Sequence, residues 1–264
     1  MTSPGPFLLL LHAFPLDRTV WDDVVGPVSE AGWDVVVPDL RGFGESRYGI
    51  DGPDDEPSLA AMARDVIAIL DRVGARSVVL GGLSMGGYVA MELLRQVPER
   101  VDALVLADTK ASADDDAARE NRLRVADQVL AAGSTEALAR AMVPTLLGST
   151  SLTGRPDVVE RVRALVEATD PAAVAWAQRA MAARPDSRGT LAAFPRPALV
   201  IWGEEDLTCS RAEQDLMVTA LPDGQLATIA HAGHLAAMEA PAEVAAVLLQ
   251  FLAGSAGVRR SGTG

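Results

Sequence analysis

Residues 78–87 read Val-Val-Leu-Gly-Gly-Leu-Ser-Met-Gly-Gly, and the serine in this stretch is Ser84. The apolar run 77–82 is typical of a buried strand, and the apolar spacing over 85–97 predicts a helix. Gly82 and Gly86 stand two residues before and two residues after Ser84, where the absence of a Cβ lets a strand reverse sharply into a helix. The stretch therefore predicts a tight strand-turn-helix from which the serine hydroxyl projects.

Similar apolar runs recur along the chain. Six are near-continuous rather than alternating, at 7–11, 34–38, 77–82, 101–107, 197–203 and 225–229. Five amphipathic stretches with helical spacing accompany them, at 19–31, 58–73, 85–97, 209–221 and 242–252. Continuous apolar strands that alternate with helices are typical of a parallel sheet covered on both faces. The sequence therefore predicts an α/β fold.

One long interval, between Ala107 and Pro197, interrupts this alternation. Its apolar residues recur at helical spacing in four stretches, at 117–131, 135–147, 156–168 and 172–183. Open α/β sheets bind ligands at the carboxyl ends of their strands. We therefore predict that residues 109–191 form a helical cap over that edge of the sheet. Residues 1–108 and 192–254 would form the α/β core, and the small polar residues 255–264 a disordered tail.

Composition narrows the class of partner. Lys and Arg total 23 against 36 Asp and Glu, which gives a net charge of −13. Nucleic acids and acidic membranes are therefore not expected to bind, because both require clustered cations.

Cys209 is the only cysteine, which excludes an intrachain disulfide and a thiolate metal cluster. Residues 1–15 have no basic segment and only about five consecutive apolar residues, too few for a signal peptide or a membrane span. We expect a cytoplasmic protein.

Partners that could activate the serine lie far from it in the chain. A serine hydroxyl is a poor nucleophile at neutral pH, so it needs a base within hydrogen-bond reach and a group that orients the base. Among the three histidines, His12 ends the first predicted strand, whereas His231 and His234 follow the last one. Either late histidine could reach over the turn. The segment 202–206, Trp-Gly-Glu-Glu-Asp, offers an acid after the preceding strand, at Asp206.

Two simpler interpretations compete with a nucleophilic serine. The stretch around Ser84 could be a glycine-rich turn in which the serine is incidental. It could also be a dinucleotide-binding loop, with Asp108 after the next strand as the acid that binds the ribose. The dinucleotide pattern requires glycine where Ser84 stands, and its spacing is not met. The order serine, acid, histidine, each after a strand, favours the nucleophile instead.

Five segments together resemble the α/β-hydrolase family. They are, in order, Leu-His-Ala-Phe-Pro at 11–15, Pro-Asp-Leu-Arg-Gly-Phe-Gly-Glu-Ser at 38–46, Gly-Leu-Ser-Met-Gly at 82–86, Trp-Gly-Glu-Glu-Asp at 202–206, and Ala-Gly-His at 232–234 followed by Glu239 and Pro241. The resemblance covers nearly the whole chain outside the predicted cap. It points to the branch that contains small-molecule esterases, lactonases, carbon–carbon bond hydrolases and cofactor-free haloperoxidases.

The resemblance implies a role for each candidate residue. Ser84 would be the nucleophile, Asp206 the orienting acid and His234 the base, because the family's Gly-His pair is followed by Glu-x-Pro. His231 would then be structural or lie at the edge of the pocket. Asp108 is the reserve acid, since some family members place theirs after that strand.

The resemblance also implies an oxyanion hole formed by the backbone N–H groups of Phe14 and Met85. Two features depart from the family pattern. Ala13 stands where the family has glycine, so the backbone there must accommodate a Cβ. The chain also starts almost directly on the strand 7–11, without the family's initial antiparallel hairpin. We therefore expect a sheet of about six strands, all parallel.

The expected substrate is a small-molecule ester or lactone, cleaved without a metal or an organic cofactor. Trp176, Met181 and Met142 on the cap are the predicted substrate-binding residues, and Arg179 or Arg184 would hold a substrate carboxylate if either faced the pocket. Haloperoxidase or perhydrolase chemistry, carbon–carbon bond hydrolysis, and a non-catalytic ligand-binding role on the same fold are the alternatives. The oligomeric state is left open.

Overall fold

The computed structural model describes residues 5–46 and 56–255 of the chain. Its centre is one sheet of six strands in the order β2-β1-β3-β4-β5-β6, and every neighbouring pair is parallel. The strands are β1 (Phe7–Leu11), β2 (Asp34–Val36), β3 (Val78–Leu83), β4 (Val101–Ala107), β5 (Ala198–Gly203) and β6 (Gly224–Ile229). The predicted α/β class and the predicted six parallel strands are confirmed.

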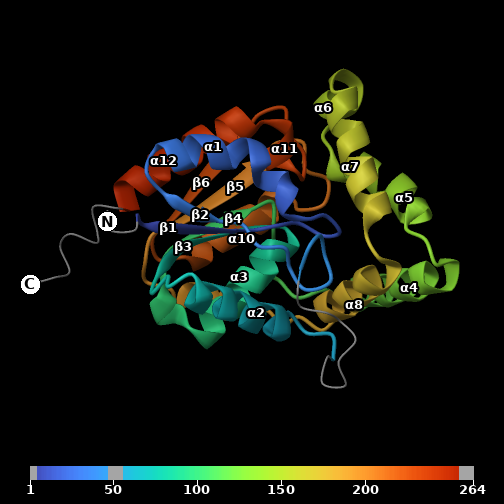
Figure 1. Cartoon of the computed structure of the whole chain (residues 1–264), viewed down its shortest axis with the longest axis horizontal. Helices are drawn as coiled ribbons and strands as arrows, with labels where there is room; N and C mark the ends of the chain where they lie inside the picture. The colour runs from blue at the N-terminus through green and yellow to red at the C-terminus, as the bar shows by residue number, and fades with distance from the viewer. Residues whose placement is uncertain (1–4, 47–55, 256–264) are drawn as a thin grey trace, which may run out of the picture.

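Helices cover both faces of this sheet, as Figure 1 shows. Helices α1 (Asp22–Glu30) and α12 (Pro241–Ser255) pack together on one face. Helices α2 (Leu59–Arg72), α3 (Met85–Gln96), α9 (Arg188–Ala192) and α10 (Arg211–Ala220) form a continuous layer on the other. Short helices η1 (Arg18–Trp21), η2 (Pro98–Arg100) and α11 (Ala236–Glu239) complete the connections.

Local chemistry explains where the elements differ from the predicted ranges. Helix α10 begins at Arg211 rather than at Cys209, because the Ser210 side chain accepts a hydrogen bond from the Glu213 N–H and caps the helix. Strand β2 ends at Val36, two residues before Pro38, which has no N–H to donate to a ladder. Of the predicted tail 255–264, Ser255 ends α12 and the remaining residues lie outside the described part of the chain.

Five helices lie between β4 and α9 in the chain. They are α4 (Asp116–Ala132), α5 (Glu136–Leu146), α6 (Ser149–Gly154), α7 (Pro156–Ala168) and α8 (Pro171–Ala182). Helix α4 packs against α8, and α5 packs against α7, so the group stands together beside the sheet in Figure 1. We use the name cap for residues 109–191, the range given above. Helix α9 extends one residue past the end of this range, to Ala192, and packs against α3 and α10 of the core layer.

The cap contacts loops that follow the carboxyl ends of the strands. The Thr169 hydroxyl donates to the carbonyl of Pro15, which follows β1, and the Thr150 N–H donates to Glu205, which follows β5. Every residue of β3 beneath is buried, and Leu8 to Leu11 of β1 show no exposed surface. Among the described residues, no helix has the length and apolar character that crossing a membrane requires.

Candidate active site

The turn after β3 has the geometry that its glycines predict. Ser84 lies between the end of β3 and the start of α3 with φ 53° and ψ −112°. A Cβ on Gly82 would collide with the backbone of Gly86, and a Cβ on Gly86 would collide with the carbonyl of Leu11. A left-handed conformation at a residue other than glycine costs on the order of 1–3 kcal/mol. The packing of β3, α3 and β1 around the turn holds Ser84 in this conformation.

Three predicted site residues meet at this turn. The Nε2 atom of His234 lies 2.8 Å from Ser84 Oγ, and its Nδ1 atom lies 2.9 Å from Asp206 Oδ2. All three residues are buried, and Ser84 keeps 9% of its surface exposed. Because the Asp206 carboxylate can only accept, Nδ1 of His234 carries the hydrogen and Nε2 presents its lone pair to the serine hydroxyl.

The acid is held from its other side. Asp206 Oδ1 accepts hydrogen bonds from the N–H groups of Thr208, at 2.7 Å, and Cys209, at 3.0 Å. These bonds leave Oδ2 facing the imidazole of His234. The loop after β5 therefore orients the acid before any ligand arrives.

Cys209 lies beside this acid, and its thiol, Asp206 and His234 have ligand atoms within 4.8 Å of one another. Burial raises the pKa of the Cys209 thiol well above its usual value. A thiol that keeps its proton is a poor metal ligand. The carboxylate oxygens of Asp206 are in addition already occupied by hydrogen bonds.

The reserve acid has a different set of partners. Asp108, at the end of β4, accepts hydrogen bonds from the N–H of Gly203 at 2.7 Å and from the N–H of Ala236 at 3.4 Å. Burial raises the pKa of Asp108 well above its usual value, and the nearby charge of Asp206 raises it further. Its oxygens thus join the loops after β5 and β6.

The other two histidines lie in different surroundings. His231 is exposed and adopts a positive φ of 59° in the loop after β6. His12 is fully buried, its Nδ1 lies 3.0 Å from the Ala13 carbonyl, and its Nε2 accepts the N–H of Leu40 at 2.9 Å. Burial lowers the pKa of His12, so the neutral ring is favoured. His12 therefore joins the loops that follow β1 and β2.

The two predicted oxyanion donors flank the turn. Met85 is the first residue of α3, where helix geometry leaves N–H groups without partners and the helix dipole favours negative charge. Phe14 lies in the loop after β1, with its ring edge-on to Phe43. Within residues 5–46 and 56–255, neither N–H donates a hydrogen bond to another protein group. Ala13 is fully buried, so the loop accommodates its Cβ.

Two of the three predicted substrate-binding residues lie on α8 and the third lies on α5. Trp176 is buried on α8, with the guanidinium of Arg41 5.9 Å from its ring centroid. Arg41 forms a two-bond ion pair with Asp65 of α2, at 2.7 and 2.8 Å, so Trp176 packs where α8 meets the core. Met181, also on α8, is buried with its sulfur 3.5 Å from Arg122. Met142 is half-buried on α5.

The two cap arginines considered as ligands for a substrate carboxylate are each paired with an aspartate. Arg179 is exposed and pairs with Asp127 at 3.0 Å. Arg184 is buried and donates one hydrogen bond of 2.7 Å to Asp114 Oδ1, and a second guanidinium nitrogen forms an ion pair with Oδ2 at 2.7 Å. The guanidinium also stacks 4.2 Å from the ring centroid of Tyr88. Burial alone would raise the pKa of Asp114, but the ion pairs with Arg184 and Arg122 lower it to about 2.

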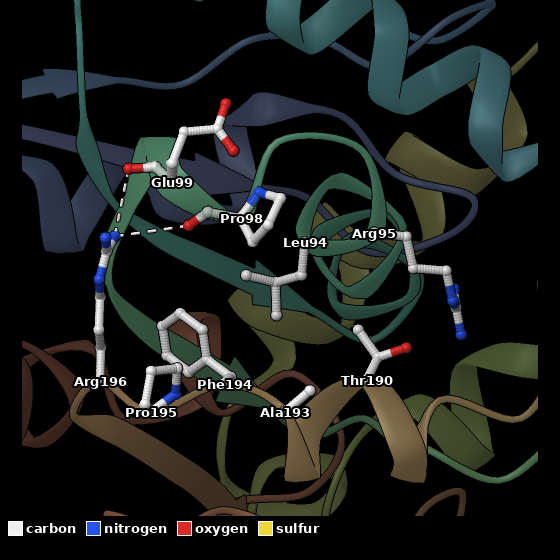
Figure 2. A pocket seen from close by; sticks show the side chains of 9 residues that line it. All are labelled: Leu94, Arg95, Pro98, Glu99, Thr190, Ala193, Phe194, Pro195 and Arg196. Carbon is white, nitrogen blue, oxygen red and sulfur yellow. Dashed lines mark hydrogen bonds between the residues drawn. The ribbon is translucent and has the colours of Figure 1, made fainter.

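A cavity of about 410 Å³ lies elsewhere, between the carboxyl end of α3 and α9 (Figure 2). Leu94 and Phe194 supply its apolar lining, and the guanidinium of Arg196 donates to the carbonyls of Pro98 and Glu99. Leu94 is ten residues beyond Ser84 on α3, which corresponds to roughly 15 Å along the helix axis. This cavity contains none of the predicted site residues.

Two carboxylates close in sequence to Asp206 and His234 received no role from the sequence. Glu205 directly precedes Asp206, and Glu239 ends α11 five residues after His234. Both accept hydrogen bonds from cap backbone, at Thr150 and Gly148 respectively. Glu239 is part of the segment that suggested the family, but its spacing alone does not indicate a partner far away in the cap.

This fold and this site agree with the family match. Residues 6–241 match the alpha/beta hydrolase fold family, and the chain belongs to it. A thermophilic esterase from Thermogutta terrifontis, solved with malate bound, is 38% identical and superposes with a TM-score of 0.89 over 96% of this chain and 92% of that one. The pimeloyl-[acyl-carrier protein] methyl ester esterase of Nitrosomonas europaea is 29% identical over 88% of this chain and 90% of its own length.

A third relative shares the fold at lower identity. The enol-lactonase of Burkholderia xenovorans LB400 has a TM-score of 0.85 at 24% identity, over 95% of this chain and 92% of that one. The predicted resemblance to α/β-hydrolases is confirmed, and the protein is a hydrolase enzyme.

Proposed function

We propose that this protein is a serine hydrolase that cleaves a small-molecule carboxylic ester or lactone through an acyl-enzyme intermediate. The main support is the unbroken line of hydrogen bonds from Ser84 Oγ through both nitrogens of His234 to Asp206 Oδ2. The three side chains come from loops far apart in the sequence. A structural role alone gives no reason for a strained serine to face an oriented imidazole.

The reaction follows from this arrangement. His234 Nε2 takes the hydroxyl proton as Ser84 Oγ attacks the substrate carbonyl, and Asp206 stabilises the imidazolium that forms. His234 then gives the proton to the leaving alkoxide, which completes the acyl-enzyme. Water enters, loses a proton to His234 and attacks the acyl carbon, and the carboxylic acid leaves as Ser84 regains its proton. Every proton transfer uses the same imidazole.

The carbonyl oxygen becomes negative in each tetrahedral intermediate. We assign its stabilisation to the N–H groups of Met85 and Phe14, which have no protein acceptor among the described residues. A donor aimed at such an oxygen contributes roughly 3 kcal/mol to transition-state stabilisation. The N-terminus of α3 adds a favourable dipole.

The relatives favour an ester over the other chemistries of this fold. Two proteins named as esterases align with this chain over most of its length, at 38% and 29% identity. The enol-lactonase likeness, at 24% identity, supports the fold alone. Arg184, the buried cap arginine, is already paired with Asp114, so it gives no reason to expect an acidic substrate.

The test is reaction with a fluorophosphonate probe together with hydrolysis of p-nitrophenyl acetate. We expect the probe to label Ser84, and Ser84→Ala to lower kcat by about 10⁴- to 10⁶-fold. Ser29→Ala, an exposed serine on α1, is the matched control and should keep full activity. Near-native hydrolysis by Ser84→Ala would contradict the proposal. An unlabelled protein that binds small molecules tightly would favour the non-catalytic ligand-binding role instead.

A further inference from the structure

The carboxylate of Glu239 holds the backbone on both sides of the candidate base. Its Oε1 atom accepts the N–H of Gly233 at 2.9 Å and the N–H of Leu235 at 3.2 Å, and these two residues flank His234. Glu239 itself is buried, with 6% of its surface exposed. One side chain therefore fixes the loop from which the imidazole extends toward Ser84.

The other oxygen of the same carboxylate reaches the cap. Glu239 Oε2 accepts the N–H of Gly148 at 2.8 Å. Burial raises the pKa of the Glu239 carboxyl, and the hydroxyl of the buried Ser151 nearby acts against that rise. Arg155, at the start of α7, donates to the backbone carbonyl of Glu239 at 3.3 Å. The loop that carries His234 is thus joined to the cap through one buried group.

The loop that carries the acid contacts the same cap segment. Glu205, next to Asp206, accepts hydrogen bonds from the N–H of Thr150 at 2.8 Å, the hydroxyl of Thr150 at 2.6 Å and the hydroxyl of Ser149 at 3.0 Å. The Glu205 N–H in turn donates to the Ala232 carbonyl at 2.8 Å. Four consecutive cap residues, 148–151, therefore bind both loops.

Close backbone contact leaves little freedom at this junction. A Cβ on Gly148 would come within 2.9 Å of the Gly233 nitrogen, and a Cβ on Gly233 would collide with the Gly148 nitrogen. The two glycines let the cap backbone lie directly against the residue before His234. A shift of this cap segment would therefore be transmitted to the imidazole.

We propose that Glu239 is a positioning residue, which holds the His234 imidazole against Ser84 and makes that geometry depend on the seating of cap residues 148–151. The proposal rests on the proposed function, in which His234 is the base. A base must lie within hydrogen-bond reach of the proton it takes, and a misplacement of about 1 Å can lower a rate by about 10²-fold. Glu239 acts through His234 and does not touch the substrate.

The variant Glu239→Gln tests this role, because an amide has one oxygen and cannot accept from Gly233, Leu235 and Gly148 together. We expect kcat for p-nitrophenyl acetate to fall by about 10- to 100-fold, with KM changed by less than about threefold. In proton NMR, the downfield signal of the His234 Nδ1 hydrogen should be lost or broadened. With only three histidines in the chain, His234→Ala identifies this signal.

The control is Glu204→Gln, an exposed carboxylate on the neighbouring loop, which should leave both readouts unchanged. If Glu239→Gln folds but keeps the wild-type kcat, or loses kcat while the His234 signal is unchanged, the positioning role is wrong. If Glu239→Gln does not fold, Ser151→Ala removes one cap donor. It should broaden the His234 signal and lower kcat by less than Glu239→Gln, and no change in either would overturn the proposal.

The NMR readout needs no substrate, so it separates this inference from the proposed function. Activity that survives Ser84→Ala, combined with a His234 signal that depends on Glu239, would remove the hydrolytic mechanism and keep the positioning contact. If Ser84→Ala loses activity while the His234 signal is the same in Glu239→Gln as in wild type, the hydrolytic mechanism stands and the positioning role of Glu239 is wrong.

Discussion

At the scale of single residues, two buried aspartates lie near His234, and their surroundings separate them. Asp206 accepts two backbone N–H groups with Oδ1 and faces the imidazole with Oδ2. Asp108 is held by two backbone donors away from the imidazole, and burial raises its pKa. The same residue type therefore contacts the imidazole at one position and joins two loops at the other.

Asp206→Asn and Asp108→Asn form a matched pair. We expect Asp206→Asn to lower kcat by about 10³- to 10⁴-fold, because an amide donor facing Nδ1 favours the wrong tautomer of His234. Asp108→Asn should lower kcat by less than about tenfold, because Asp108 has no bond to the imidazole. Steady-state kinetics on a small activated ester measures both. A larger loss in Asp108→Asn than in Asp206→Asn would exchange the two roles.

At the scale of elements, the glycines of the turn after β3 set how closely β3, α3 and β1 can approach. Gly86 lies against the carbonyl of Leu11, which leaves no room for a methyl group. Gly26 lies inside α1, where a Cβ would meet nothing within 4 Å. Gly86 therefore lies in a closely packed turn, whereas Gly26 lies on an open helix surface.

Gly86→Ala and Gly26→Ala should shift stability in opposite directions. Alanine at position 26 should raise the free energy of unfolding by about 0.5–1 kcal/mol, because glycine is unfavourable inside a helix. Alanine at position 86 should lower it by about 1–3 kcal/mol through overpacking, and should also reduce kcat, because Ser84 would move with the turn. Urea unfolding and ester hydrolysis measure these effects. Wild-type stability and activity in Gly86→Ala would show that the turn can relax.

At the scale of the whole molecule, the cap is joined to the core where the chain leaves β4 and where it returns toward β5. Asp114 precedes α4 and Arg184 follows α8, and their buried ion pair ties these two connections together. Arg184 also stacks on Tyr88 of α3, and the Ser187 N–H donates to the Ala111 carbonyl at 2.8 Å. The position of the cap relative to the core therefore depends on a few buried contacts.

Asp114→Asn should lower the free energy of unfolding by about 3 kcal/mol at pH 7, because it leaves the buried Arg184 without its counter-charge. Asp127→Asn removes the exposed ion pair with Arg179 and should change the free energy of unfolding by less than about 1 kcal/mol. The folded pKa of Asp114, about 2, lies below its ordinary value of 3.8. The contribution of the Asp114 carboxylate to the free energy of unfolding is therefore complete above pH 3.8 and is lost as the pH falls toward 2.

Urea unfolding of wild type and both variants between pH 7 and pH 2 tests this prediction. The difference between wild type and Asp114→Asn should shrink below about pH 4, following the protonation of Asp114. A difference that stays constant down to pH 2 would mean that the carboxylate charge contributes nothing.

The sequence was sufficient to predict the sheet and the residues at its edge. Continuous apolar runs indicated six parallel strands. A strand of a parallel sheet is covered by helices on both faces, so its residues are apolar throughout and do not alternate with polar ones. The glycines around Ser84 indicated the strained turn, because only residues without a Cβ fit there. The order of Ser84, Asp206 and His234 along the chain pointed to the same group of side chains that the structure brings within hydrogen-bond distance.

The contacts of the cap could not be predicted in this way. Trp176 and Met181 have the apolar character of pocket residues, yet helical periodicity does not say whether such a side chain faces a ligand or a neighbouring helix. Arg184 and Asp114, 70 residues apart, neutralise each other only because folding brings them together. The chemistry of a side chain is local and follows from its type, whereas its partner depends on how distant segments pack. The links from Glu239 to Gly148 and to the loop of His234 exist only in the folded chain.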